Sequence, residues 1–300
     1  MRKQFCEAMV ARAAERDLVF LTGDLGFMAL EPLATALGAR FINAGVSEQN
    51  MISVAAAMAK DGLKPWAYSI APFCYARPFE QIRNDISLHD LPVRLVGNGG
   101  GYGYGVMGPT HHAIEDYGVL LTLPNLKVFT PSFDEDVESA VAAVVQHPHC
   151  AYLRLGRGEG PRGYQPAPFA AWRKLAEGDF PGVLIAVGPL ASVYLAHLQA
   201  AANSRKPALW ALGEMPIGLE RMPQALLDEL ARAETLVVAE EHVAQGGAAQ
   251  QIALTLAAAG LRVPRLAART AQHQFARYGS QVWLRREAGL DAPSVLRCFA

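Results

Sequence analysis

A carboxylate stands at the start of a strongly apolar helical segment in this sequence. Glu48 falls in the first turn of a helix expected over 47–60, and most residues from 51 to 58 are apolar, which indicates that the helix is buried. A carboxylate at the mouth of such a helix would be partly desolvated, would have a raised pKa and would suit proton transfer. The plainer interpretation is that an acidic residue in a first turn interacts favourably with the helix dipole.

Two adjacent histidines follow a glycine-rich loop. The loop covers residues 97–108, and Pro109 and Thr110 then favour a helix start ahead of His111 and His112. Imidazole suits acid–base chemistry near neutral pH, but neighbouring residues point in different directions on a helix, so at most one of the pair faces a common site. The plainer interpretation leaves both as surface or hydrogen-bonded histidines. Two histidines that share a metal are spaced four apart on a helix, so this pair predicts no metal site.

Within this loop, Gly103-x-Gly105-x-x-Gly108 has the spelling of a dinucleotide-binding motif. That motif opens a helix directly after a strand, and an acidic residue follows about 20 positions later. Here the strand is expected to end near residue 97, and Pro109 separates the loop from the helix. We therefore interpret the glycines as allowing unusual backbone conformations and close approach of a ligand.

Two further turns carry acidic residues. Gly23-Asp24-Leu25-Gly26 follows a strand, and ligands bind beyond the carboxyl ends of parallel strands; the plainer interpretation is that Asp24 caps the next helix. Glu240-Glu241-His242 ends a strand and precedes a helix. For this second group, a structural turn or a subunit contact explains the residues more simply than catalysis.

Strands alternate with helices along the whole chain, which predicts an α/β fold with two domains, each a mostly parallel sheet flanked by helices. The expected strands are 18–21, 41–42, 65–68, 93–96, 126–129, 151–155, 183–187, 207–212, 235–239 and 262–266. The expected helices include 4–16, 76–88, 112–122, 134–146, 190–202, 223–233 and 247–259. A glycine- and proline-rich segment after residue 155 indicates a linker. We therefore predict a first domain at 1–160, a linker at 161–174 and a second domain at 175–300.

The composition excludes several classes of protein. Apolar residues make up 51% of the 300 residues and charged residues 18%, which suits a large buried core and not a disordered chain. The 27 basic and 28 acidic residues balance, so neither nucleic acid nor an anionic membrane is the expected partner. The four cysteines are far apart, which favours a reducing, cytoplasmic location over a disulfide framework. No apolar run reaches the roughly 20 residues of a membrane span, and no signal peptide is expected.

Taken together, several of these segments resemble the transketolase family of thiamine-diphosphate enzymes, and more narrowly the C-terminal half of a transketolase encoded as two chains. The matching segments are Gly23-Asp24-Leu25, Asn43-x-Gly45-x-Ser47-Glu48-Gln49-Asn50-Met51, Phe79-Glu80-Gln81-Ile82-Arg83, Gly108-Pro109-Thr110-His111-His112-Ala113-Ile114-Glu115-Asp116, Leu123-Pro124-Asn125, Arg154-Leu155-Gly156-Arg157 and Val238-Ala239-Glu240-Glu241-His242. Each match is weak by itself. Their order and spacing over nearly the whole chain make the combination specific.

The resemblance implies a pyrimidine-binding domain followed by the family's C-terminal domain. It also implies that thiamine diphosphate binds between this chain and an α subunit, whose diphosphate-binding domain would hold the diphosphate and Mg²⁺. The family's metal signature is Gly-Asp-Gly with a later Asn, and Gly23-Asp24-Leu25 and Asn43 do not match it. We therefore expect a β subunit without metal ligands, in an α2β2 assembly with a homodimeric β core.

The resemblance assigns roles at the cofactor. Glu48 matches the glutamate that hydrogen-bonds N1′ of the aminopyrimidine ring, which favours the 4′-imino tautomer that removes the C2 proton of the thiazolium. Phe73 matches an aromatic residue that packs against the pyrimidine, because a flat ring needs a flat apolar surface. Ile70 stands where the family often has another Phe, and Asp24 matches an acid at the cofactor's edge.

Further residues match the family's substrate site. His111 matches an active-site histidine that faces substrate hydroxyls or an oxyanion. Arg157 matches a cation that binds the substrate phosphate with its forked donors, and Arg2 matches a second such cation.

Three departures concern the substrate. Met107 replaces an aspartate that reads a donor hydroxyl in ordinary transketolases. A phosphate-binding His near Gly99 and a Ser near Met28 are also missing. We therefore expect ketol or acyl transfer that makes or breaks a C–C bond of an atypical small-molecule substrate.

Three alternatives remain open. The first is the β subunit of a thiamine enzyme that decarboxylates an α-keto acid, which would share Glu48 but is disfavoured by the run 109–116. The second is a nicotinamide-dependent dehydrogenase, which the placement of the glycines disfavours. The third is a catalytically silent scaffold subunit, although such a subunit would not need Glu48 beside Phe73.

Overall fold

The first half of the chain supplies six strands of a seven-stranded sheet with the strand order β10-β5-β6-β4-β3-β1-β2. The computed structural model describes residues 1–200, 205–277 and 279–300. The strands of this sheet are β1 (Leu18–Thr22), β2 (Phe41–Asn43), β3 (Lys64–Ile70), β4 (Arg94–Asn98), β5 (Leu126–Phe129), β6 (Cys150–Leu155) and β10 (Glu214–Met215). The first six run parallel to their neighbours and β10 is antiparallel to β5. Every residue of β1 and β6 is buried, as expected for strands covered on both faces.

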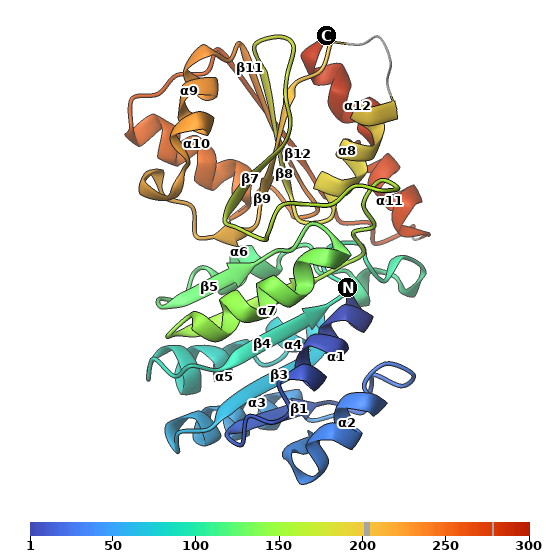
Figure 1. The fold of residues 1–300 in the computed structure, drawn as a ribbon, viewed down its shortest axis with the longest axis vertical. Helices are drawn as coiled ribbons and strands as arrows, with labels where there is room; N and C mark the ends of the chain where they lie inside the picture. Colours follow the sequence, from blue (N-terminus) through green and yellow to red (C-terminus); the bar gives the residue numbers. More distant parts are fainter. Residues whose placement is uncertain (201–204, 278) are drawn as a thin grey trace.

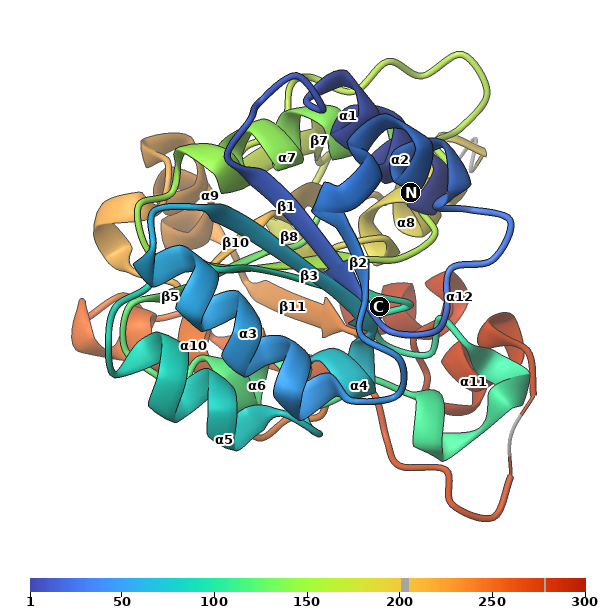
Figure 2. The same ribbon diagram turned by 90° about the horizontal axis from the view of Figure 1, so that it is seen from below.

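Helices cover both faces of this sheet (Figure 2). One face carries α1 (Arg2–Ala11), α2 (Glu31–Leu37) and α7 (Val137–Gln146). The other carries α3 (Glu48–Lys60), α4 (Ala71–Tyr75), α5 (Phe79–Gln81), the π-helical turn η2 (Ile82–Ser87) and α6 (Asp116–Leu120). Short 3₁₀ turns complete this half: η1 (Gly38–Arg40), η3 (Gly105–Met107), η4 (Pro109–His111) and η5 (Asp134–Asp136).

The second half builds a five-stranded sheet above the first (Figure 1). Its order is β12-β11-β8-β9-β7, and β7 is antiparallel to β9. The strands are β7 (Trp172–Ala176), β8 (Gly182–Val187), β9 (Ala208–Leu212), β11 (Thr235–Glu240) and β12 (Arg265–Thr270). The helices are α8 (Leu190–Ala200), α9 (Gln224–Arg232), α10 (Ala248–Ala258), α11 (Gln281–Glu287) and α12 (Ala292–Leu296), with 3₁₀ turns η6 (Leu219–Arg221) and η7 (Arg297–Phe299).

The predicted fold class is confirmed, and the differences lie in individual elements. The structure adds α2, β7 and β10, which the apolar pattern did not indicate. The helix expected over 112–122 is wrong in its first half, because the 3₁₀ turn η4 ends at residue 111 and α6 begins only at residue 116. The helix expected over 76–88 begins at residue 79 and continues as a π-helical turn. The strand expected at 262–266 lies at 265–270 instead.

The linker segment also differs from its expected form. Its last residues, 172–174, belong to β7, which pairs along β9 at the edge of the second sheet. The helix expected over 190–202 ends at residue 200 among the described residues, and 201–202 lie outside them. The division into two domains stays a prediction, because β10 comes from the second half of the chain and joins the first sheet.

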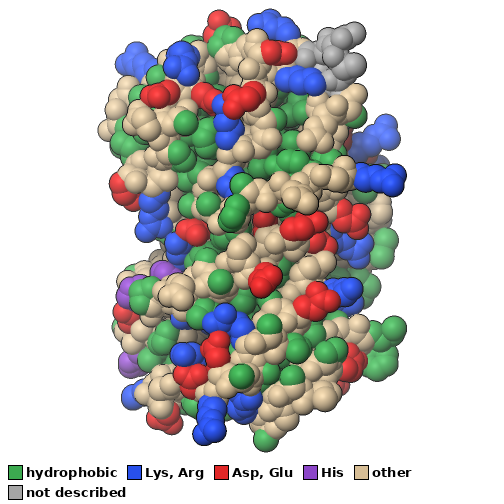
Figure 3. Space-filling view, in the orientation of Figure 1, with side chains coloured by type: hydrophobic (Ala, Val, Ile, Leu, Met, Phe, Trp, Pro, Cys, Tyr) green, Lys and Arg blue, Asp and Glu red, His purple; other side chains and the backbone are tan. Residues whose placement is uncertain are grey.

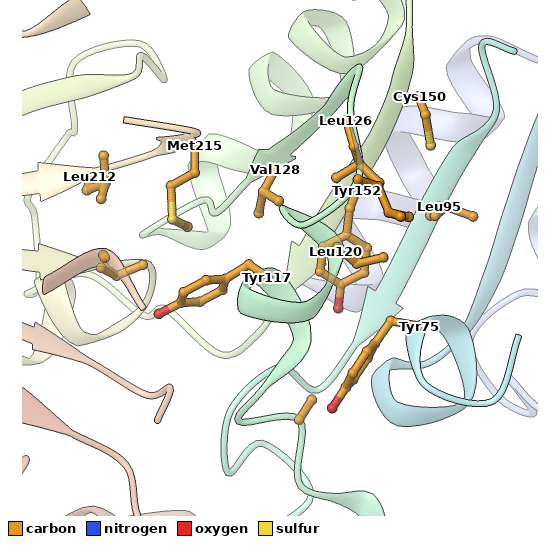
Figure 4. Packing of buried hydrophobic residues seen from close by; sticks show 14 of the residues in the cluster. Tyr75, Leu95, Tyr117, Leu120, Leu126, Val128, Cys150, Tyr152, Leu212 and Met215 are labelled. Carbon is orange, nitrogen blue, oxygen red and sulfur yellow. The ribbon is translucent and has the colours of Figure 1, made fainter. Parts of the chain in front are cut away.

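One apolar core runs through both halves of the chain. Figure 4 shows Met215 from the second half beside Val128 of β5, with Leu212 on the other side of Met215. Tyr117 and Tyr152 are fully buried in the same cluster. On the face seen in Figure 3, basic and acidic side chains are interspersed, in keeping with the balanced charge of the sequence.

A buried hydrogen bond between two ion pairs also joins the two halves. Arg154 on β6 donates to the carboxylate of Asp116 over 2.7 Å and to the backbone oxygen of Glu241 over 2.9 Å. Glu241 in turn forms an ion pair with Arg285 of α11, at 2.7 Å. The Arg285 guanidinium lowers the pKa of the buried Glu241 carboxyl against the effect of burial. These charges are buried but paired, as buried charges need to be.

The neighbouring residues of this turn are also structural. The Glu240 carboxylate accepts hydrogen bonds from the backbone N–H groups of Ala248 and Ala249 at the start of α10. His242 accepts one from the backbone N–H of Gly118 over 3.0 Å. These contacts agree with the structural interpretation of Glu240-Glu241-His242.

Candidate functional site

The sequence-predicted site residues gather at the carboxyl edge of the first sheet. The central strands β3, β4 and β6 end side by side there, since Ile70 pairs with Asn98 and Asn98 with Leu155. The loops that follow these strands therefore lie next to one another. This is the edge where open α/β sheets bind their ligands.

Glu48 is the first residue of α3 and is only 5% exposed. One guanidinium nitrogen of Arg77, Nη1, donates to both carboxylate oxygens of Glu48 over 2.8 Å. The guanidinium carbon of Arg77 also lies 4.3 Å from the centre of the Phe73 ring. Arg77 therefore joins the carboxylate to the aromatic ring, in one group that we call the Glu48 cluster (Glu48, Phe73, Arg77 and His111).

His111 belongs to the Glu48 cluster because its ring packs edge-on against Phe73, with 5.2 Å between ring centres. Its Nδ1 is hydrogen-bonded to the hydroxyl of Thr110 at 2.9 Å. Burial and the neighbouring His112 lower the pKa of His111 below its ordinary value. His112 instead is buried, with its Nε2 hydrogen-bonded to the backbone oxygen of Gly105 at 2.9 Å. Of the two histidines, His111 is therefore the one that faces the cluster.

Arg2 and Arg157 meet at a cavity of about 410 Å³, which we call the basic cavity. Its walls are Met1, Arg2, Lys3, Gln4, Asn98, Gly99, Gly103, Tyr104, Asp134, Gly156 and Arg157. The carboxylate of Asp134 is paired with the amino group of Met1 at 2.9 Å. The three basic side chains give the cavity a positive potential that suits an anion.

Tyr104 connects the basic cavity to the Glu48 cluster. Its ring centre lies 6.0 Å from that of His111, and its hydroxyl accepts a hydrogen bond of 2.7 Å from Nδ2 of Asn98. Sequence reasoning did not single out Tyr104 or Arg77. Arg77 had a signal, because it follows Phe73 by four residues, the spacing at which helical side chains meet.

The remaining predicted site residues, Asp24, Ile70 and Met107, belong neither to the Glu48 cluster nor to the walls of the basic cavity. Asp24 is exposed and hydrogen-bonded to Asn43 at 3.2 Å, in the loop beside the start of α3. Ile70 is half-buried at the point where β3 gives way to α4. Met107 ends η3, is 56% exposed and belongs neither to the Glu48 cluster nor to the walls of the basic cavity.

The described residues contain neither a cluster of metal-ligating side chains nor a helix able to cross a membrane. Within 1–200, 205–277 and 279–300, no three or more His, Cys, Asp or Glu side chains are grouped closely enough to hold a metal ion. In the same ranges, none of the helices has the length and apolar character needed to span a membrane.

Comparison with known proteins agrees with this arrangement. Residues 1–162, more than half of the chain, match the family described as "Transketolase, pyrimidine binding domain". The chain belongs to this family, whose members are thiamine-diphosphate-dependent enzymes related to transketolase.

Individual relatives and solved structures point the same way. One of the subunits of apulose-4-phosphate transketolase from Phocaeicola vulgatus is 32% identical over 170 residues, 56% of this chain and 54% of the relative. 1-Deoxy-D-xylulose-5-phosphate synthase 1 of Geobacter metallireducens is 28% identical over 299 residues, 97% of this chain and 47% of the relative. The chain thus spans about half the length of these relatives. A structure titled "Split gene transketolase, inactive beta4 tetramer" superposes with a TM-score of 0.82 at 26% identity, covering 99% of this chain and 95% of that one.

Proposed function

We propose that the chain is the cytoplasmic β subunit of a thiamine-diphosphate-dependent, transketolase-like transferase that makes or breaks C–C bonds by ketol or acyl transfer. The observation that carries the proposal is the Glu48 cluster, in which a buried carboxylate, an aromatic face and an uncharged imidazole converge at the sheet edge. A matching relative is named as one subunit of its transketolase, and a matching structure is named as a split-gene product. These names support the proposal that an α subunit completes the enzyme, as α2β2 around a homodimeric β core.

The residues of the Glu48 cluster fit the aminopyrimidine ring of thiamine diphosphate. The cofactor, when bound, would supply a carbon nucleophile for addition to a carbonyl group. Glu48 would hold a ring nitrogen and exchange a proton at its carboxylate oxygen, while Phe73 would cover one ring face. Arg77 occupies both oxygens of Glu48 but is 43% exposed, so it can swing into solvent and free the carboxylate. Mg²⁺ and the diphosphate would be held by the α subunit.

The basic cavity supports a substrate with an anionic group. Arg2, Lys3 and Arg157 provide charge-assisted donors, and Arg forms paired hydrogen bonds with phosphate oxygens. Met107 and Gly99 stand where the family has residues that bind a substrate hydroxyl and the substrate phosphate. We therefore propose a substrate other than ordinary pentose phosphates.

A calorimetric titration tests the proposed function. Thiamine diphosphate with Mg²⁺ is titrated into this chain alone and into the chain mixed with a candidate α subunit. We expect binding only in the mixture, and expect Glu48→Ala and Phe73→Ala to abolish it. A well-folded αβ complex that binds no cofactor would overturn the thiamine assignment and favour a scaffold subunit. Release of carbon dioxide from pyruvate would instead favour the decarboxylating alternative.

Arg157→Ala is expected to raise KM for the phosphorylated substrate about 10–100-fold and to leave kcat nearly unchanged. A hydrogen bond to a charged group contributes roughly 1.5–3 kcal/mol, and each 1.4 kcal/mol is about a factor of ten. Steady-state kinetics of the αβ complex measures both constants. Arg162→Ala is the matched control, because Arg162 is exposed outside the basic cavity. Equal KM values for the two variants would mean that Arg157 does not bind the substrate.

The fall of activity at low pH is expected to follow the protonation of His111. Burial and His112 lower the pKa of His111 from 6.5, so the ring is neutral at pH 7 and becomes protonated only at more acidic pH. We therefore expect kcat/KM to fall as the pH drops through a value below 6.5, and expect His111→Asn to remove this limb along with much of the activity. His89→Asn, at an exposed histidine, should keep the wild-type profile. A limb that persists in His111→Asn would assign it to another group.

A further inference from the structure

The ring of Tyr104 lies directly on Gly99, the first residue after β4. Gly99 has a φ of +76°, and a Cβ atom built on it would overlap both Cδ2 and Cε2 of the Tyr104 ring. Real side chains do not approach so closely. A side chain at position 99 and the ring of Tyr104 therefore exclude each other, and the glycine makes room for the tyrosine.

The hydroxyl of Tyr104 still has a proton to donate. Its oxygen accepts the Asn98 amide at 2.7 Å, and both residues line the basic cavity together with Arg2 and Arg157. Among the hydrogen bonds of the described residues, none has this hydroxyl as the donor. Burial raises the pKa of Tyr104, although the charges of Arg2 and Arg157 oppose this, so the hydroxyl stays protonated at neutral pH.

We propose that Tyr104 is a specificity-determining residue whose hydroxyl donates a hydrogen bond to a phosphate oxygen of the substrate in the basic cavity. The inference rests on the proposed function for the identity of the reaction, while the anion site itself is built from this chain alone. Tyr104 takes over the space that a side chain at position 99 would fill, and supplies a neutral donor beside the two arginines. Its ring occupies the space over Gly99 and its hydroxyl accepts the Asn98 amide, so the donor is positioned before an anion binds.

Tyr104 also lies at the wall of the basic cavity that is nearest to His111 of the Glu48 cluster. The Tyr104 ring stands between the basic cavity and His111, at 6.0 Å from the imidazole ring. A phosphate held at the hydroxyl would place the rest of the substrate on the side of the ring that leads to His111. Tyr104 would then set the distance between the anionic end of the substrate and its reacting end.

Binding of inorganic phosphate to the full chain tests the proposal without any α subunit. Isothermal titration calorimetry compares the wild type with Tyr104→Phe, which keeps the ring and removes only the hydroxyl. We expect the Kd for phosphate to rise about tenfold, the loss expected for one hydrogen bond to a charged group. Tyr164→Phe is the control, because Tyr164 packs on Phe133 away from the cavity. Acetate, titrated in parallel, should bind more weakly than phosphate to the wild type.

A second variant keeps the hydroxyl but moves it. Gly99→Ala should push the Tyr104 ring away and weaken phosphate binding by a similar factor, with circular dichroism confirming that the fold is retained. Phosphate affinity within about twofold of the wild type in Tyr104→Phe would overturn the proposal, because one hydrogen bond to a charged group is worth more than that. Wild-type binding of acetate in preference to phosphate would overturn it too. Failure of thiamine diphosphate to bind the αβ complex would overturn the proposed function and leave the phosphate result standing.

Discussion

Glu48→Gln is expected to lower kcat of the proposed αβ complex about 10²–10⁴-fold, the usual contribution of a positioned acid–base group. Glutamine keeps the size of the side chain and its hydrogen-bonding oxygen but can no longer exchange a proton. Because the partner of Glu48, Arg77, is 43% exposed, water can solvate the guanidinium once the ion pair is gone. The unfolding temperature should therefore change little. Single-turnover and steady-state kinetics measure the loss, and a thermal melt checks the fold.

The matched control is Glu80→Gln, an isosteric change at an exposed glutamate on α5. We expect it to retain wild-type kcat. Retention of more than a tenth of the activity by Glu48→Gln would mean that the carboxylate at the start of α3 does not exchange a proton during turnover. A large drop in the unfolding temperature of the same variant would indicate that the Glu48–Arg77 pair stabilises the fold.

Arg154→Met should lower the free energy of unfolding by about 3–5 kcal/mol, the cost of removing one partner from a buried ion pair. Arg154 is 3% exposed and Asp116 is fully buried, so the carboxylate would be left without a cation. The substitution also leaves the backbone oxygens of Ala113 and Glu241 without their guanidinium donor. Urea denaturation at equilibrium, followed by circular dichroism, measures the change.

Arg262→Met is the control for this change, since Arg262 is exposed on the surface of the second half. Surface substitutions of this kind usually alter the free energy of unfolding by less than about 0.5 kcal/mol. A double variant, Arg154→Met with Asp116→Leu, separates the two contributions. It should recover part of the lost stability, because an apolar pair of similar volume can replace a buried ion pair. No recovery would assign the loss to the backbone oxygens instead.

The sequence was most informative where one local signal decided the outcome. Apolar runs bounded by glycine or proline located the strands, because parallel strands buried on both faces consist of continuous apolar residues. The burial of Glu48 followed from the apolar helix behind it. The choice between His111 and His112 did not follow, since it depends on a 3₁₀ turn that places one ring against Phe73 and the other beneath Gly105.

Contacts between segments far apart in the sequence could not be predicted from the local pattern of residues. The two-residue strand β10 is too short to give a period, and β7 begins within the segment predicted as a linker. The pairing of Arg77 with Glu48 joins the start of α3 to the segment that follows α4, over 29 positions of the sequence. Tyr104 stood within the glycine-rich loop, but only the fold shows that its ring occupies the space above Gly99.

The short strand β10 has a consequence for how the chain folds during synthesis. Glu214 and Met215 close the edge of the first sheet against β5, and the backbone N–H of Thr130, next to β5, donates to the backbone oxygen of Gly213 over 2.7 Å. During synthesis, β5 is complete some 85 residues before β10 is made. The edge of β5 that β10 covers therefore stays unpaired during that time. An unpaired edge strand can pair with a strand of another chain and so cause aggregation. This topology lengthens the time during which that can happen. The part of the chain that is synthesised last therefore covers the edge strand of the sheet that is synthesised first.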